Sequence, residues 1–102
     1  MKSNKFATLA AALVLSCAGA MAQPAPEHVR SWAAGCANCH GTNGQAQPGL
    51  AGLAGVPAAA TVAKMQAFKS GALPATLMHQ ISKGYSDEQI QAIAAYFAAQ
   101  KN

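Results

Sequence analysis

The sequence predicts a small all-α domain, and three observations support this prediction. Apolar residues recur at helical spacing, most clearly at Ile90, Ile93, Ala94 and Phe97. Glycines and prolines separate the helical segments, and no run of alternating polar and apolar residues indicates a strand. The third observation is a Cys-x-x-Cys-His run at residues 36–40, which closes the first helical segment and is the most specific chemical feature of the chain.

The first 22 residues have the pattern of a signal peptide that is cleaved before Gln23. Two lysines precede an apolar stretch, and an Ala-x-Ala sequence ends it. An alternative is a lipoprotein signal that would leave a lipid anchor on Cys17. We therefore expect export to the bacterial periplasm, with residues 1–22 as the leader and residues 23–102 as the mature domain. No later segment is long and apolar enough to span a membrane.

The first helix of the mature domain is expected over residues 26–39. Proline at its start is tolerated because the first N–H groups of a helix have no intrahelical partner. Trp32 lies one turn before Cys36 and therefore shares a face with it. Residues 41–55 contain five glycines and Pro48, which predicts a loop with tight turns.

A second helix is expected to begin after Pro57 and to end at Gly71, a residue type that commonly terminates helices. It carries Thr61, Met65 and Phe68 on one side. After it comes a short irregular segment that starts at Pro74, contains Met78 and Ile81, and stops at Gly84.

The last helix has the clearest start signal. Residues 86–89 read Ser-Asp-Glu-Gln, a capping box whose two acids lie in the first turn, where the helix dipole favours negative charge. The apolar residues at 90, 93, 94 and 97 then form the face that we expect to be buried.

Cys36, Cys39 and His40 form the attachment pattern of haem c. Each thiol can add to one vinyl group of the porphyrin, and the adjoining imidazole can bind the iron from one side. A zinc site would need two more ligands at suitable spacing, and a redox dithiol would need a βαβ context; the sequence has neither. The chain has three cysteines, so the mature domain keeps two, and we expect one covalent haem and no disulfide.

The predicted mature domain has two candidates for a sulfur ligand on the other side of the iron, Met65 and Met78. Met65 lies inside a regular amphipathic helix, where a core role is expected. Met78 lies in the irregular segment and is the preferred axial ligand. His79 could also bind iron, but adjacent side chains point in different directions, so only one of the pair should face the metal. We expect His79, like His28, to be exposed.

Five basic and three acidic residues remain after the leader, and they are scattered along the chain. No basic stripe with interleaved aromatic residues occurs, which argues against nucleic-acid binding. Lys64, Lys69 and Lys83 have two interpretations: an ordinary solvated surface, or a positive rim that steers an acidic partner.

Together these features resemble the small class I cytochromes c, in which three main helices enclose one haem. In that family the first and last helices cross at aromatic residues, for which Trp32 and Tyr96 or Phe97 stand at suitable places. A more specific resemblance, to the cytochrome subunits of flavocytochrome c sulfide dehydrogenases, rests on the blocks at residues 68–71, 75–78, 83–86 and 95–97. Carriers of the c4 and c553 type share some of these blocks.

The resemblance implies periplasmic electron transfer through one haem c, with His40 and Met78 as axial ligands. It also implies that the Pro48 carbonyl orients His40; the alternative is that Pro48 is an ordinary turn residue. The expected partner is a flavoprotein subunit that oxidises sulfide, so this chain by itself would transfer electrons and catalyse nothing. One alternative is a freestanding c553 or c4 carrier. Another is a five-coordinate haem that binds a gas or activates peroxide, with His79 as the nearby base.

Overall fold

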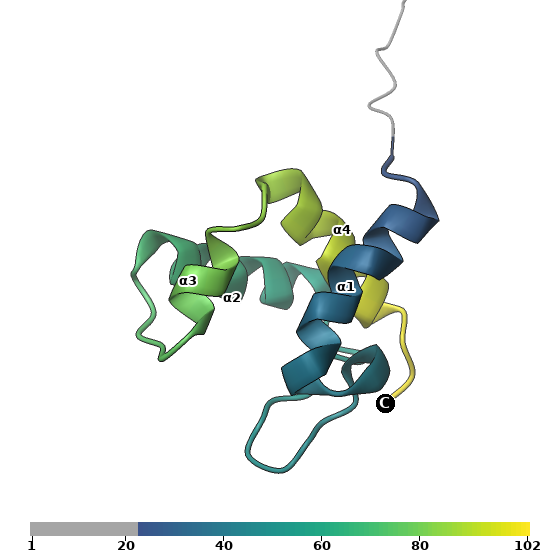
Figure 1. Ribbon diagram of the computed structural model, residues 1–102, viewed down its shortest axis with the longest axis horizontal. Coiled ribbons are helices and arrows are strands. Elements are labelled where there is room, and N and C mark those ends of the chain that lie inside the picture. Colours follow the sequence, from purple (N-terminus) through teal and green to yellow (C-terminus); the bar gives the residue numbers. More distant parts are fainter. Residues whose placement is uncertain (1–22) are drawn as a thin grey trace, which may run out of the picture.

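The computed structural model describes residues 23–102 as helices joined by loops (Figure 1). The prediction of an all-α domain is confirmed: no strand occurs in the described part of the chain, and one isolated bridge joins Gln47 to Leu50. The predicted leader and Cys17 lie outside the described residues. The elements, in chain order, are α1 (Pro26–His40), a 3₁₀ turn η1 (Thr42–Gly44), α2 (Ala58–Ser70), α3 (Met78–Ser82) and α4 (Asp87–Ala98).

Local sequence signals determine where the helices begin and end. α1 starts at Pro26 as predicted and continues one residue further than expected, to His40. α2 ends at Gly71, whose φ of 82° is left-handed and suits a residue without a Cβ. The predicted capping box of α4 is present, because the Ser86 hydroxyl accepts from the Gln89 N–H at 3.1 Å while the Gln89 side chain accepts from the Ser86 N–H at 2.9 Å.

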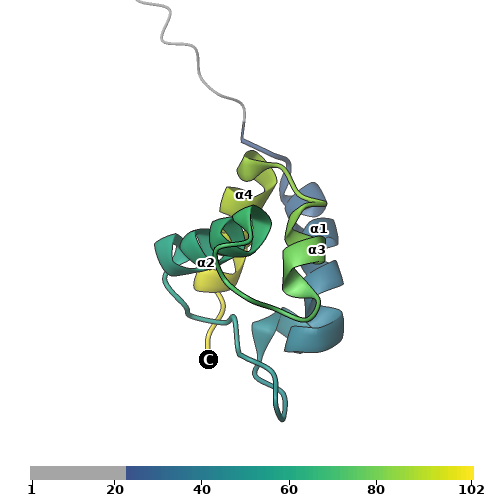
Figure 2. The same ribbon diagram turned by 90° about the vertical axis from the view of Figure 1, so that its left-hand side faces the viewer.

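α4 lies between the other long helices and packs against both α1 and α2, and α3 packs on α2. Within residues 23–102, α1 and α3 make little or no direct contact with each other. Figure 1 shows α3 at the left of the view and α1 at the right, and the turned view in Figure 2 shows the loop after α1 at the lower edge of the molecule. The helix that carries the Cys-x-x-Cys-His run and the helix that carries Met78 are therefore connected through α2 and α4.

The core at the α1–α4 crossing is small. It consists of Ala33 from α1 with Ile93 and Phe97 from α4, each at most 3% exposed. Trp32 and Tyr96 pack partly buried against this cluster, in agreement with the expected aromatic crossing of the first and last helices. The four residues predicted to form the buried face of the last helix are all buried.

The cap of α4 can be tested by replacing Ser86 with Ala. The substitution leaves the Gln89 N–H without its partner, so we expect the free energy of unfolding of the haem-loaded protein to fall by about 1 kcal/mol. Urea denaturation followed by circular dichroism measures this change. As a control, Ser31→Ala at an exposed position inside α1 should change the value by less than about 0.5 kcal/mol. Equal losses in both variants would contradict the capping role.

Candidate functional site

The two cysteines and the histidine of the Cys-x-x-Cys-His run lie on one face at the C-terminal end of α1. Cys36, Cys39 and His40 are three and four positions apart, a spacing that places helical side chains side by side. Both cysteines are free thiols; Cys36 is half-buried and Cys39 is exposed. Burial raises the pKa of the Cys36 thiol, and its backbone hydrogen bond offsets this only in part. The C-terminal end of α1 thus carries two thiols and an imidazole within two turns of the helix.

The His40 ring is oriented by a main-chain oxygen. Its Nδ1 lies 2.7 Å from the carbonyl oxygen of Ala51, to which it donates a hydrogen bond. This bond places the ring proton on Nδ1 and leaves the lone pair of Nε2 free to bind a metal.

The acceptor for His40 is Ala51, whereas the resemblance implied Pro48. The chain makes an exposed turn at Pro48, closed by the bridge between Gln47 and Leu50, and reaches the imidazole three residues later. Sequence reasoning missed Ala51 because every residue type carries a main-chain carbonyl, so no side-chain signal marks the position.

The start of the loop that carries Ala51 is fixed to the C-terminal half of α4. The Gly44 carbonyl accepts from the Leu53 and Ala54 N–H groups at 2.7 and 3.0 Å, and the Tyr96 hydroxyl donates to Asn43 Oδ1 at 3.0 Å. Gly44 has a φ of 76°, and a Cβ there would lie 2.7 Å from the Phe97 ring. The loop therefore requires glycine at this position, which explains part of the glycine content of residues 41–55.

Met78 is the first residue of α3, so the segment is more regular than predicted: the irregular part ends at Leu77 and a short helix follows. Met78 is half-buried, and Ile81, one turn further along α3, is 42% exposed. Leu77, at the start of the helix, is 64% exposed. Among residues 23–102, the large apolar side chains that are exposed are Leu50, Leu73, Leu77 and Ile81. Leu77 and Ile81 lie just before and within α3, and Leu73 lies in the segment that leads to it, so a large apolar group could cover them.

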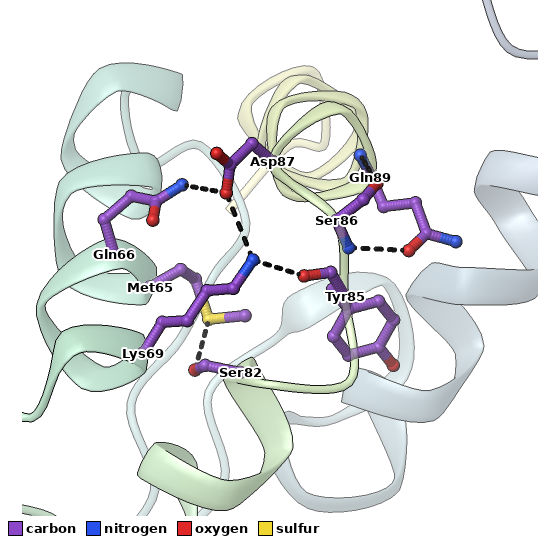
Figure 3. A network of polar contacts seen from close by, with 8 residues as sticks. All are labelled: Met65, Gln66, Lys69, Ser82, Tyr85, Ser86, Asp87 and Gln89. Carbon is purple, nitrogen blue, oxygen red and sulfur yellow. Dashed lines mark hydrogen bonds and ion pairs between the residues drawn. The ribbon is translucent and has the colours of Figure 1, made fainter.

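Met65 has the core role that the sequence predicted. It is 8% exposed, and its sulfur accepts a hydrogen bond from the Ser82 hydroxyl at 3.5 Å across the α2–α3 contact (Figure 3). The Ser82 side chain is fully buried. Met65 is thus engaged within the protein, which leaves Met78 as the methionine available to a cofactor.

The two other histidines have different surroundings. His28 is exposed as expected, but the same expectation for His79 was wrong: the residue is half-buried and its Nδ1 is buried. This nitrogen has no hydrogen-bond partner among the described residues. A buried imidazole nitrogen ordinarily has a partner, so its position beside Met78 is consistent with a further group binding there.

The donor set fits a haem. Across residues 23–102, no group of three or more His, Cys, Asp or Glu side chains could hold a metal ion. A haem iron needs only axial ligands from the protein because the porphyrin supplies the other four. His40 and Met78 would provide these ligands, and Cys36 and Cys39 would provide the two thioether sulfurs. The zinc alternative has no support in this part of the chain.

The predicted surface lysines fall into two groups. Lys64 and Lys83 are exposed, whereas Lys69 donates to the Tyr85 carbonyl at 2.7 Å and to Asp87 Oδ1 at 3.1 Å. Hydrogen bonds from Gln66 and Lys69, together with the positive charge of Lys69, hold the pKa of the Asp87 carboxyl below its ordinary value. Lys69 is therefore committed to an internal network and is not part of a free positive rim.

No helix in the described part of the chain combines the length and apolar character needed to cross a bilayer.

Comparisons with known proteins identify a family and several similar cytochromes and electron acceptors. A model of the family described as "Cytochrome C oxidase, cbb3-type, subunit III" matches residues 23–97. The "Cytochrome subunit of sulfide dehydrogenase" of Chlorobaculum tepidum is 36% identical over 62 residues, 61% of this chain and 56% of that protein. The "Thiosulfate dehydrogenase electron acceptor" of Stutzerimonas stutzeri is 38% identical over 66 residues, 63% of this chain and 31% of that protein. "Cytochrome c-554(548)" of Halomonas halodenitrificans is 37% identical over 70 residues, 65% of this chain and 84% of that protein.

The orientation of His40 by Ala51 can be tested with two loop variants of the haem-loaded protein. Pro48→Ala should leave the visible spectrum and the reduction potential unchanged, because Pro48 does not supply the acceptor. Gly44→Ala should shift the potential and lower the free energy of unfolding by about 1–3 kcal/mol, because the new methyl group meets Phe97 and the backbone is strained. Spectropotentiometry and urea denaturation measure both effects, and a potential that moves in Pro48→Ala but not in Gly44→Ala would contradict the assignment.

Proposed function

Because this chain belongs to the cytochrome c family described as subunit III of cbb3-type cytochrome c oxidase, we propose that it is a periplasmic electron-transfer protein with a single haem c. The family membership and the all-α structure make it a class I cytochrome c. Members of this family bind haem c covalently. When bound, the haem supplies one-electron exchange between ferrous and ferric iron.

The residues of the site have distinct roles in this proposal. Cys36 and Cys39 bind the porphyrin through thioether bonds, and His40, held by the Ala51 carbonyl at 2.7 Å, binds the iron through Nε2. Met78 binds the opposite face of the iron, and its thioether favours the ferrous state and so raises the reduction potential. The single observation that carries the proposal is the His40–Ala51 hydrogen bond, since it prepares the imidazole of a Cys-x-x-Cys-His run for metal binding.

Mass spectrometry of the exported protein tests the attachment. We expect the mass of the mature chain plus one haem, retained after denaturation. Cys36→Ser and Cys39→Ser should each lose one thioether bond and yield less of the covalent adduct. A wild-type protein that releases all its haem on denaturation would contradict the assignment of the two cysteines.

The axial role of Met78 is tested by a matched pair of methionine variants. Met78→Leu should abolish the weak near-infrared charge-transfer band of the ferric protein, which reports methionine ligation, and should allow carbon monoxide to bind the reduced protein. Met65→Leu removes a sulfur of the same kind from the core and should preserve the band. The double variant Met78→Leu/His79→Ala shows whether the neighbouring imidazole takes the vacated position. A band that survives in Met78→Leu would overturn the assignment.

Within this function we propose that the chain is the cytochrome subunit of a sulfide dehydrogenase and receives electrons from a flavoprotein that oxidises sulfide. Support comes from the relative with that name in Chlorobaculum tepidum and from the sequence blocks shared with such subunits. Two of these blocks, residues 68–71 and 83–86, contain the partners of the Lys69–Tyr85 hydrogen bond. The chain spans 56% of the length of that relative.

A freestanding electron carrier is the second candidate. It is favoured by the similarity to cytochrome c-554(548), of which this chain covers 84%. The two candidates differ in their interface, because a permanent subunit needs a large, partly apolar contact whereas a shuttle makes small and brief encounters.

Purification from the native source distinguishes the two candidates. A sulfide dehydrogenase subunit should elute with an equimolar flavoprotein, and the added sulfide should reduce the haem of this complex. A carrier should elute alone at every salt concentration, and sulfide should then leave its haem oxidised. The second result would overturn the subunit assignment and retain the carrier.

A further inference from the structure

The helix that carries Met78 is too short to hold its own position. α3 has five residues, and isolated helices of this length are unstable in water. The chain enters α3 through Leu77, whose φ of −128° and ψ of −35° lie outside the helical range. The placement of Met78 must therefore come from contacts between α3, its flanking turns and α2.

Two side-chain hydrogen bonds between this part of the chain and α2 lie at or just after the C-terminal end of α3. The buried Ser82 hydroxyl donates to the Met65 sulfur at 3.5 Å, and three residues later the Tyr85 carbonyl accepts from Lys69 Nζ at 2.7 Å. Figure 3 shows the Lys69 side chain extending from α2 to the turn between α3 and α4, where Nζ lies between the Tyr85 carbonyl and Asp87. One lysine thus joins α2 to the end of α3 and to the first residue of α4.

The two bonds of Lys69 differ in strength. Asp87 is 62% exposed, and an ion pair at such a position contributes little in water. The Lys69 side chain is only 29% exposed, and its bond to the Tyr85 carbonyl is charge-assisted and partly buried. Of these two bonds, the bond to the main chain therefore does more to restrain the position of the turn.

We propose that Lys69 is a positioning residue, which holds the turn after α3 against α2 and thereby keeps Met78 in place to bind the iron. The proposal rests on the proposed role of Met78 as the sixth ligand. It predicts that removal of the Lys69–Tyr85 bond loosens α3 and weakens methionine ligation while His40 and both thioether bonds stay intact.

Four variants of the full haem-loaded protein test this role. Lys69→Met keeps a long side chain but cannot donate, so the charge-transfer band should weaken and carbon monoxide should bind the reduced protein faster by about tenfold, the factor expected for one charge-assisted hydrogen bond. Its reduction potential should fall. Lys69→Arg should restore most of the band. Asp87→Asn keeps the bond to Tyr85 and should preserve the band, and Lys64→Met is the control, because Lys64 is an exposed lysine of the same helix.

The outcomes distinguish the positioning role of Lys69 from the ligand role of Met78. Wild-type values for the band, the carbon monoxide rate and the potential in Lys69→Met would overturn the positioning role. If Lys69→Met does not fold, Lys69→Gln, which keeps a neutral donor, should show a weaker form of the same changes, and wild-type values there would again overturn the role. If the band is lost in Met78→Leu but the band, the carbon monoxide rate and the potential stay at wild-type values in Lys69→Met, only the positioning role of Lys69 is contradicted. Survival of the band in Met78→Leu would remove the ligand assignment itself.

Discussion

The small size of the protein-only core is the constraint on which the rest of the structure depends. Ala33, Ile93 and Phe97 are buried where α1 crosses α4, but α1 and α3 have no comparable contact within residues 23–102. A domain of this size buries a limited fraction of its surface and usually needs an additional link. A haem bound to Cys36 and Cys39 on α1 and to Met78 on α3 would provide that link and would cover apolar side chains that are otherwise exposed. Cofactor binding and stability are then two consequences of the same contacts.

The two axial ligands are held in different ways. His40 belongs to a long helix, and its acceptor lies in a loop whose start is fixed to α4 by the Tyr96–Asn43 hydrogen bond and to its own end by the Gly44 carbonyl. Met78 belongs to a five-residue helix whose position depends on a few side-chain contacts at its far end. We infer that the imidazole side of the iron is the rigid one and that variation in ligation strength originates on the methionine side.

Features that depend on neighbouring residues could be predicted from the sequence, whereas several specific contacts between distant residues could not. The capping box at Ser86 and the helix stop at Gly71 need only their local segments, and both are present. The Ala51 carbonyl is a main-chain group without a sequence signal, and it meets His40 only after the loop has folded. Lys69 resembles any surface lysine until α2 and the turn at Tyr85 come together. The expectation that His79 is exposed was wrong as well, since burial of its Nδ1 depends on the folded structure and not on its neighbours in the sequence.

The charge distribution bears on the kind of partner that this cytochrome uses. Residues 23–102 contain five basic and three acidic residues, and the Lys69–Asp87 pair removes one charge of each sign from the set available to a partner. A carrier that depends on brief encounters gains most from a strong surface field, because such a field raises the association rate. The other four basic residues, Arg30, Lys64, Lys83 and Lys101, are exposed, but they exceed the two remaining acids, Glu27 and Glu88, by only two charges. The small net charge of the polypeptide therefore provides little electrostatic steering, the property that a carrier captured in brief encounters depends on most.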